Sequence, residues 1–60
     1  MSSNALKSEG NQFFSRGQYK EAIDKYSEAI ELDSKNAILY ANRAQCRLKL
    51  NEYVQILIPT

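Results

Sequence analysis

The chain has 60 residues and a formal net charge of +1, so it holds one small domain at most and carries no strong field toward nucleic acid or an anionic membrane. Hydrophobic residues make up 43% and charged residues 25%, an ordinary globular balance that argues against wholesale disorder. The sequence has no histidine, the commonest general base and metal ligand, and no glycine-rich phosphate loop. Composition therefore excludes the usual enzyme classes, and we expect no catalysis, no metal and no cofactor.

Two features of the sequence indicate the cellular compartment. The single cysteine, Cys46, cannot form an internal disulfide, which favours a reducing environment. Residues 1–4 carry no basic apolar leader, so no secretory signal is expected, and the apolar run 56–58 is too short to span a bilayer. We expect a cytoplasmic protein that also enters the nucleus.

The first predicted helix covers residues 4–16. Leu6, Gly10, Phe13 and Phe14 lie on one stripe of it. A glycine inside a helix costs roughly 0.5–1 kcal/mol relative to alanine, so Gly10 indicates close contact with a second helix. Gly17 suits the C-cap or tight turn that follows, and the short link predicts an antiparallel helix pair.

The second predicted helix, residues 19–32, has the clearest helical period. Its apolar stripe consists of Tyr19, Ala22, Ile23, Tyr26, Ala29 and Ile30. The opposite, solvated face holds Lys20, Glu21, Asp24, Lys25, Glu28 and Glu31, and the spacing of Glu21 and Lys25 predicts a weak ion pair.

The third predicted helix, residues 37–50, follows a polar turn in which either Ser34 or Asn36 is the N-cap. Its predicted apolar positions are Leu39, Tyr40, Ala44, Leu48 and Leu50. Residues 51–52 are predicted to form the next turn. The tail 54–60 is expected to be loose or weakly helical, because it is rich in β-branched residues and ends near Pro59.

The chain repeats itself at a shift of 34 residues, which is the period of tetratricopeptide repeats. Leu6 corresponds to Tyr40, Gly10 to Ala44 and Tyr19 to Tyr53. Residues 6–14 resemble the first helix of such a repeat and residues 18–33 its second helix. The small residues of that family fall at Gly10, Ala22 and Ala29, and its aromatic residues at Phe13, Tyr19 and Tyr26.

This resemblance implies an all-α fold: one antiparallel helical hairpin, residues 3–34, and the first helix of an incomplete second repeat, residues 37–53. The second repeat departs from the pattern, because Arg47 replaces an aromatic residue and Ile56 replaces a small one. We therefore expect a truncated α-solenoid, either a fragment or a natural short product. Stacked repeats share their cores, so an open helix face here would pair with another copy or another repeat protein.

Three polar residues are candidates for binding a carboxylate. Lys7 and Asn11 lie one turn apart on the first predicted helix, and Asn42 lies on the third. Lysine supplies a positive charge and asparagine an N–H donor, the groups that hold a carboxylate. The alternative interpretation is that all three are ordinary solvated side chains.

The trio resembles the carboxylate clamp of co-chaperones that bind the acidic C-terminal tails of the seventy- and ninety-kilodalton heat-shock chaperones. That resemblance implies a protein-interaction module with Lys7, Asn11 and Asn42 as peptide-binding residues. The remaining clamp residues of the family, a lysine and an arginine, belong to a third repeat that this chain does not contain. Phe14 is a possible groove contact, although core packing is the alternative for it as for Phe13, Tyr19 and Tyr26.

Overall fold

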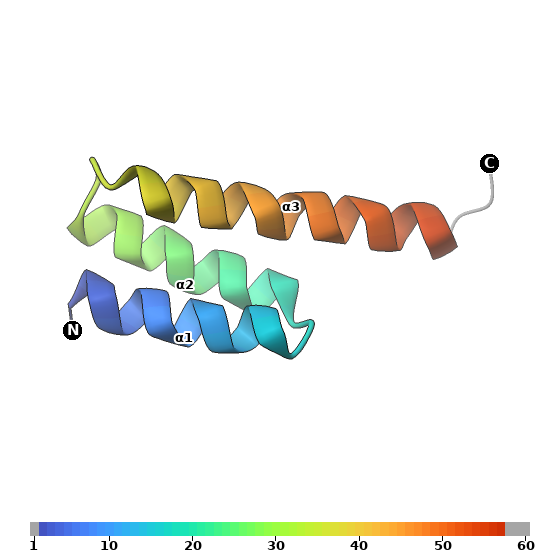
Figure 1. Ribbon diagram of the computed structural model, residues 1–60, viewed down its shortest axis with the longest axis horizontal. Helices are drawn as coiled ribbons and strands as arrows, with labels where there is room; N and C mark the ends of the chain where they lie inside the picture. Colours follow the sequence, from blue (N-terminus) through green and yellow to red (C-terminus); the bar gives the residue numbers. More distant parts are fainter. Residues whose placement is uncertain (1, 58–60) are drawn as a thin grey trace.

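Three helices, each antiparallel to the next, make up the part of the chain that the structure describes. The computed structural model places the backbone of residues 2–57 and the side chains of residues 2–52. Helix α1 covers Ser3–Ser15, α2 covers Tyr19–Leu32 and α3 covers Ala37–Leu57. Figure 1 shows α2 between the other two, so that α1 and α3 run in the same direction on either side of it. The predicted all-α hairpin with a further helix is confirmed.

Helix α1 has a defined beginning and end. The hydroxyl of Ser2 accepts a hydrogen bond from the backbone N–H of Ala5 at 3.1 Å, which satisfies one of the free donors of the first turn. At the other end Gly17 adopts φ +77°, and the N–H of Gln18 donates to the carbonyl of Phe13 at 2.9 Å. This is a Schellman ending, and it reverses the chain into α2 as the position of Gly17 predicts.

The core lies along α2. Ala22 and Ala29 are fully buried and Tyr26 is nearly so, and the small alanines let the neighbouring helices approach closely. Leu6 contributes from α1, while Leu39 and Cys46 contribute from α3. The amphipathic pattern predicted for residues 19–32 is therefore the pattern observed.

Asn36 is the N-cap of α3, which decides between the two predicted candidates. Its side-chain oxygen accepts from the backbone N–H of Ile38 at 3.0 Å, and its amide nitrogen donates to Asp33 at 3.1 Å. The backbone carbonyl of Ser34 serves a different purpose, since it accepts a hydrogen bond from the hydroxyl of Tyr40.

The predicted turn at residues 51–52 is wrong. Helix α3 passes through Asn51 and Glu52 without interruption and ends at Leu57. The position that Gly17 occupies in the first repeat is held by Asn51 in the second, so no glycine favours a left-handed turn there. Of the tail expected to be loose or weakly helical, residues 54–57 belong to this helix and residues 58–60 lie outside the described part.

The apolar stripe predicted for α3 is only partly buried. Leu39 is fully buried, but Tyr40 is 42% exposed and Leu48 is 62% exposed. Ala44 is also exposed, whereas Cys46 lies in the core. Helix α3 thus has two apolar stripes, of which one packs on α2 and the other, Tyr40–Ala44–Leu48, faces outward. We call the latter stripe the open face.

Candidate functional site

Asn11, one of the predicted carboxylate-binding residues, is tied to the core of the hairpin. The hydroxyl of Tyr26 on α2 donates to Oδ1 of Asn11 on α1, with 2.5 Å between the oxygens. Asn11 is otherwise exposed, so its amide connects a buried ring to the surface. The amide nitrogen keeps two N–H donors for another partner.

Tyr26 lies where all three helices meet. Its ring lies against Gly10 of α1. It shares the buried core with Cys46 of α3. Burial raises the pKa of Tyr26, and the charge of an ionised Cys46 would raise it further. Burial likewise raises the pKa of the Cys46 thiol. Both groups are therefore neutral through the physiological pH range, and the phenol is a hydrogen-bond donor.

Lys7 lies one turn before Asn11 at the edge of the buried stripe of α1. It follows buried Leu6 in sequence and is itself partly buried. A lysine at such an edge can bury its aliphatic stem while its ammonium reaches solvent. The structure thus places Lys7 and Asn11 on the same edge of α1.

Asn42 lies on the stripe of α3 that packs against the hairpin. Its neighbours along that stripe are Leu39 and Cys46, which are both fully buried, and Asn42 is partly buried. The next residue, Arg43, donates to the hydroxyl of Ser27 at 3.2 Å. Because Ser27 directly follows Tyr26, a single turn of α2 contacts α1 at Asn11 and α3 beside Asn42.

Phe14 packs within the hairpin. Its ring meets that of Tyr19 edge to face, with 5.3 Å between centroids, and both residues are partly buried against the core. Phe13 is packed against the core in the same way. The expected packing role of the aromatic residues is thus observed, and a groove contact by Phe14 remains a prediction.

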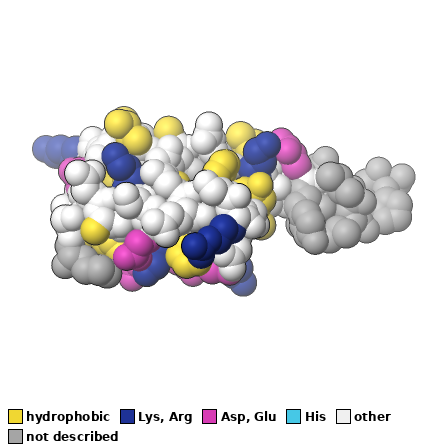
Figure 2. Space-filling view, turned by 60° about the horizontal axis from the view of Figure 1, so that its bottom comes forward, with side chains coloured by type: hydrophobic (Ala, Val, Ile, Leu, Met, Phe, Trp, Pro, Cys, Tyr) yellow, Lys and Arg dark blue, Asp and Glu magenta, His cyan; other side chains and the backbone are white. Residues whose placement is uncertain are grey.

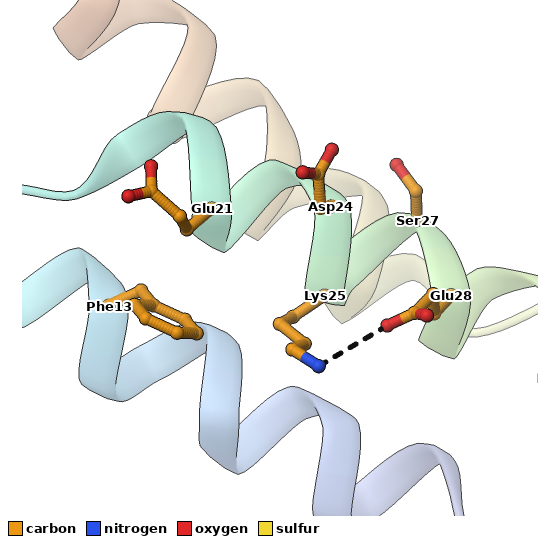
Figure 3. Close-up of a pocket in the computed structure, with 6 residues that line it drawn as sticks. All are labelled: Phe13, Glu21, Asp24, Lys25, Ser27 and Glu28. Atoms are coloured by element: carbon orange, nitrogen blue, oxygen red, sulfur yellow. Dashed lines mark ion pairs between the residues drawn. The ribbon is translucent and has the colours of Figure 1, made fainter.

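A hollow of about 500 Å³ opens elsewhere, on the outer side of the α1–α2 hairpin. Figure 3 shows that Phe13 comes from α1 and that the other lining residues lie along α2: Glu21, Asp24, Lys25, Ser27 and Glu28. None of the three predicted carboxylate-binding residues lines it. One of its lining residues, Lys25, is already paired with Glu28, as the dashed line in Figure 3 marks.

Lys25 makes an interhelical ion pair that the sequence pattern missed. Its ammonium lies 3.1 Å from a carboxylate oxygen of Glu9 on α1 and 3.6 Å from one of Glu28. The expected pair with Glu21 is wrong, because the ammonium points across to α1 and Glu21 accepts from Gln18 instead. The hydrogen bond to Glu9 and the charge of Glu9 raise the pKa of Lys25. This pair could be predicted only if the way in which α1 and α2 cross were known.

The described surface carries charges of both signs. Figure 2 shows basic and acidic side chains interspersed on the face in view, with apolar groups between them. Among residues 2–57, no helical stretch combines the length and the apolarity that crossing a bilayer requires. Within the same residues, no cluster of three acidic or cysteine side chains is arranged to hold a metal ion.

Comparison with known proteins identifies the repeat. The family described as TPR repeat matches residues 10–51. The chain is 54% identical over 48 residues to serine/threonine-protein phosphatase T of Schizosaccharomyces pombe, which covers 80% of this chain and 10% of that protein. It is 47% identical over 51 residues to stress-induced-phosphoprotein 1 of Caenorhabditis elegans, covering 85% and 16%.

A third relative, heat shock protein sti1 homolog of Schizosaccharomyces pombe, is 46% identical over 52 residues, or 87% of this chain and 9% of that protein. No solved structure matches the chain. The chain thus spans between 9% and 16% of the length of these relatives. With the family match running from α1 through most of α3 on an observed helical hairpin, the chain belongs to the tetratricopeptide repeat family.

Proposed function

We propose that this chain is a protein-interaction module that binds acidic C-terminal peptides through Lys7, Asn11 and Asn42. The observation that carries the proposal is the position of the two asparagines. Asn11 on α1 accepts a hydrogen bond from Tyr26, and Asn42 on α3 precedes Arg43, which donates to Ser27, the residue after Tyr26. Two parallel helices that each carry an amide, with a lysine one turn from the first, would suit a terminal carboxylate.

Each residue has a distinct task in the proposed site. Lys7 supplies the positive charge that attracts an anion, and the two amides supply N–H donors of fixed direction. Hydrogen bonds to a charged group are worth about 1.5–3 kcal/mol, roughly twice those between neutral groups. A peptide that ends in a free carboxylate should therefore bind better than the same peptide ending in an amide.

We infer that the natural ligands are the C-terminal tails of the seventy- and ninety-kilodalton heat-shock chaperones. Support comes from the carboxylate-clamp pattern and from relatives named stress-induced-phosphoprotein 1 and heat shock protein sti1 homolog. The clamp of the resembled co-chaperones has two more basic residues on a third repeat. Each missing contact lowers affinity by about ten- to a hundredfold, so we expect weak binding by this chain alone.

The test is a titration of the ¹⁵N-labelled chain with a Met-Glu-Glu-Val-Asp peptide, followed by amide correlation spectra. Lys7, Asn11 and Asn42 should shift with the free acid and respond much less to the C-terminally amidated peptide. Equal responses to both peptides, or none, would contradict the proposal.

A matched pair of lysine variants separates site binding from general attraction. Lys7→Ala should lose about tenfold in affinity for the free acid, because it removes the only cation that we place in the site. Lys20→Ala, which removes a lysine from the exposed face of α2, should bind like the unaltered chain. If the two variants weaken binding equally, long-range charge rather than the proposed site attracts the peptide.

The open face of α3 supports a second candidate function, which is pairing with another copy or another repeat protein. Tyr40, Ala44 and Leu48 repeat the positions of Leu6, Gly10 and Phe14 at the 34-residue period. In α1 that stripe packs on α2, whereas in α3 its members are exposed. We accordingly propose residues 3–34 as one repeat and α3 as the first helix of a second.

Sedimentation at increasing concentration tests this second candidate. A mass that rises with concentration, and falls back in Leu48→Lys, supports pairing through the open face. Gln45→Lys gives a matched control at an exposed position farther around the helix from that stripe. A mass that stays monomeric in all three proteins would exclude self-pairing.

We propose no catalytic role, and a cytoplasmic and nuclear location. The match to phosphatase T covers 10% of that protein, so it carries no argument for phosphatase activity here. The free thiol of Cys46 is consistent with a reducing compartment.

A further inference from the structure

Tyr26 connects the most buried part of the hairpin to the proposed peptide site. Its side chain is only 2% exposed, yet its hydroxyl reaches the exposed residue Asn11. We propose that Tyr26 is the positioning residue that makes Asn11 present N–H donors, and not its oxygen, to the bound peptide, which gives the site its preference for a carboxylate. This inference rests on the proposed function and assigns the origin of its anion selectivity.

The chemistry of the amide explains why its orientation matters. An asparagine side chain has an acceptor oxygen at one end and a donor NH₂ group at the other, and rotation by half a turn exchanges the two. With its oxygen outward, Asn11 would repel a carboxylate, which only accepts hydrogen bonds. A phenolic O–H that donates to Oδ1 holds the oxygen inward, so the NH₂ group is left for the ligand.

The ring that carries this hydroxyl has little freedom to move. A Cβ added to Gly10 would lie 2.6 Å from Cε1 and 2.8 Å from Cδ1 of Tyr26, so the ring lies directly on the backbone of α1. The residue adjacent to that glycine is Asn11 itself. The ring touches the backbone of α1 on one side and is buried on the others. Its hydroxyl is therefore held in a fixed position relative to the Asn11 amide.

A second tyrosine provides a matched control. The hydroxyl of Tyr40 donates to the backbone carbonyl of Ser34 at 2.8 Å, and this bond does not involve Asn11. Tyr26→Phe and Tyr40→Phe each remove one hydroxyl that donates one hydrogen bond. A merely structural contribution of a tyrosine hydroxyl would be lost in both variants, whereas orientation of Asn11 would be lost only in Tyr26→Phe.

The first experiment needs no peptide. ¹⁵N relaxation of the Asn11 side-chain NH₂ group should show one ordered orientation in the unaltered chain and in Tyr40→Phe, and faster internal motion in Tyr26→Phe. If Tyr26→Phe fails to fold, the unaltered chain alone decides. The positioning role is overturned if the Asn11 amide moves freely in the unaltered chain. It is also overturned if the amide is equally ordered in the unaltered chain and in Tyr26→Phe.

The second experiment measures affinities for the free-acid and amidated Met-Glu-Glu-Val-Asp peptides. The ratio of the two affinities should fall about tenfold in Tyr26→Phe and stay unchanged in Tyr40→Phe. In an Asn11→Ala background, Tyr26→Phe should have no further effect on the ratio.

Different results would contradict the proposed function and the positioning role of Tyr26. A chain without any preference for the free acid overturns the proposed function, whatever the relaxation data show. A preference that persists in Tyr26→Phe overturns only the role of Tyr26.

Discussion

The ring of Tyr26 occupies the space that a side chain at residue 10 would fill. The nearest ring atom lies 2.6 Å from where a Cβ of residue 10 would be, closer than real Cβ contacts come. The helical glycine, unfavourable by propensity alone, thus allows the closest approach between α1 and α2. The same approach brings the hydroxyl of Tyr26 to Asn11, so packing and the proposed site share one contact.

Gly10→Ala should therefore destabilise the hairpin although alanine favours helices. The propensity gain is about 0.5–1 kcal/mol, while forcing a methyl group against a buried ring costs about 1–3 kcal/mol. These ranges leave a net loss of up to about 2.5 kcal/mol, measured by urea denaturation followed by circular dichroism. Tyr26→Leu should relieve the clash, so Gly10→Ala should be neutral or stabilising in that background. A stabilising Gly10→Ala in the unaltered chain would contradict this packing.

Ala22→Asp should unfold the chain. Ala22 is fully buried, and among the side chains of residues 2–52 none in the core is basic, so the variant would bury an unpaired charge. Far-ultraviolet circular dichroism should show loss of helicity. Lys20→Asp, at an exposed position of the same helix turn, is the control and should stay folded. Retained helicity in Ala22→Asp would mean that the register of α2 is wrong.

Asn36→Ala should lower stability by about 1 kcal/mol, since it removes the side-chain acceptor for the N–H of Ile38. Ser34→Ala should change stability by much less, because the group of Ser34 that accepts a hydrogen bond is its backbone carbonyl. Thermal denaturation of both variants makes the comparison. A larger loss from Ser34→Ala would assign the cap to the wrong residue.

Stability should fall as the solution becomes alkaline. Burial raises the pKa of Cys46 above its ordinary value of 9.0, so the unfolded chain loses this proton before the folded chain does. Stability from this group is complete below pH 9.0 and decreases above it, and Tyr26 adds the same trend above its ordinary value of 10.0.

Melting temperatures between pH 8 and pH 10, under reducing conditions, test the contribution of Cys46. Cys46→Ala should give a flatter decline above pH 9, whatever its melting temperature at pH 8. Parallel declines for the two proteins would mean that the thiol titrates alike in both states.

The sequence predicts the hairpin well because its signals are local. The 3.6-residue period from Tyr19 to Leu32 defines both the helix and its buried face, and Gly17 marks a turn that requires positive φ. Gly10 indicated a close crossing, which Tyr26 supplies. Such signals need no knowledge of distant residues.

Helix α3 was harder to predict because its pattern is ambiguous. It carries apolar residues on two stripes, and only the positions of the neighbouring helices decide that Cys46 is buried and Leu48 is exposed. A turn was predicted at residues 51–52, but asparagine does not interrupt the helix there. The partners of Asn11 and Lys25 were likewise hidden, because both contacts join residues on different helices.

The 21-residue length of α3 has a consequence for how the molecule opens. At about 1.5 Å per residue it reaches roughly 31 Å, against roughly 20 Å for α1, so its C-terminal end extends past the hairpin in Figure 1. In a hydrogen–deuterium exchange experiment, the backbone amides at that end should exchange first. Those of α2, which is flanked on both sides, would do so last, and the order of exchange would follow the order of the helices in space rather than along the chain.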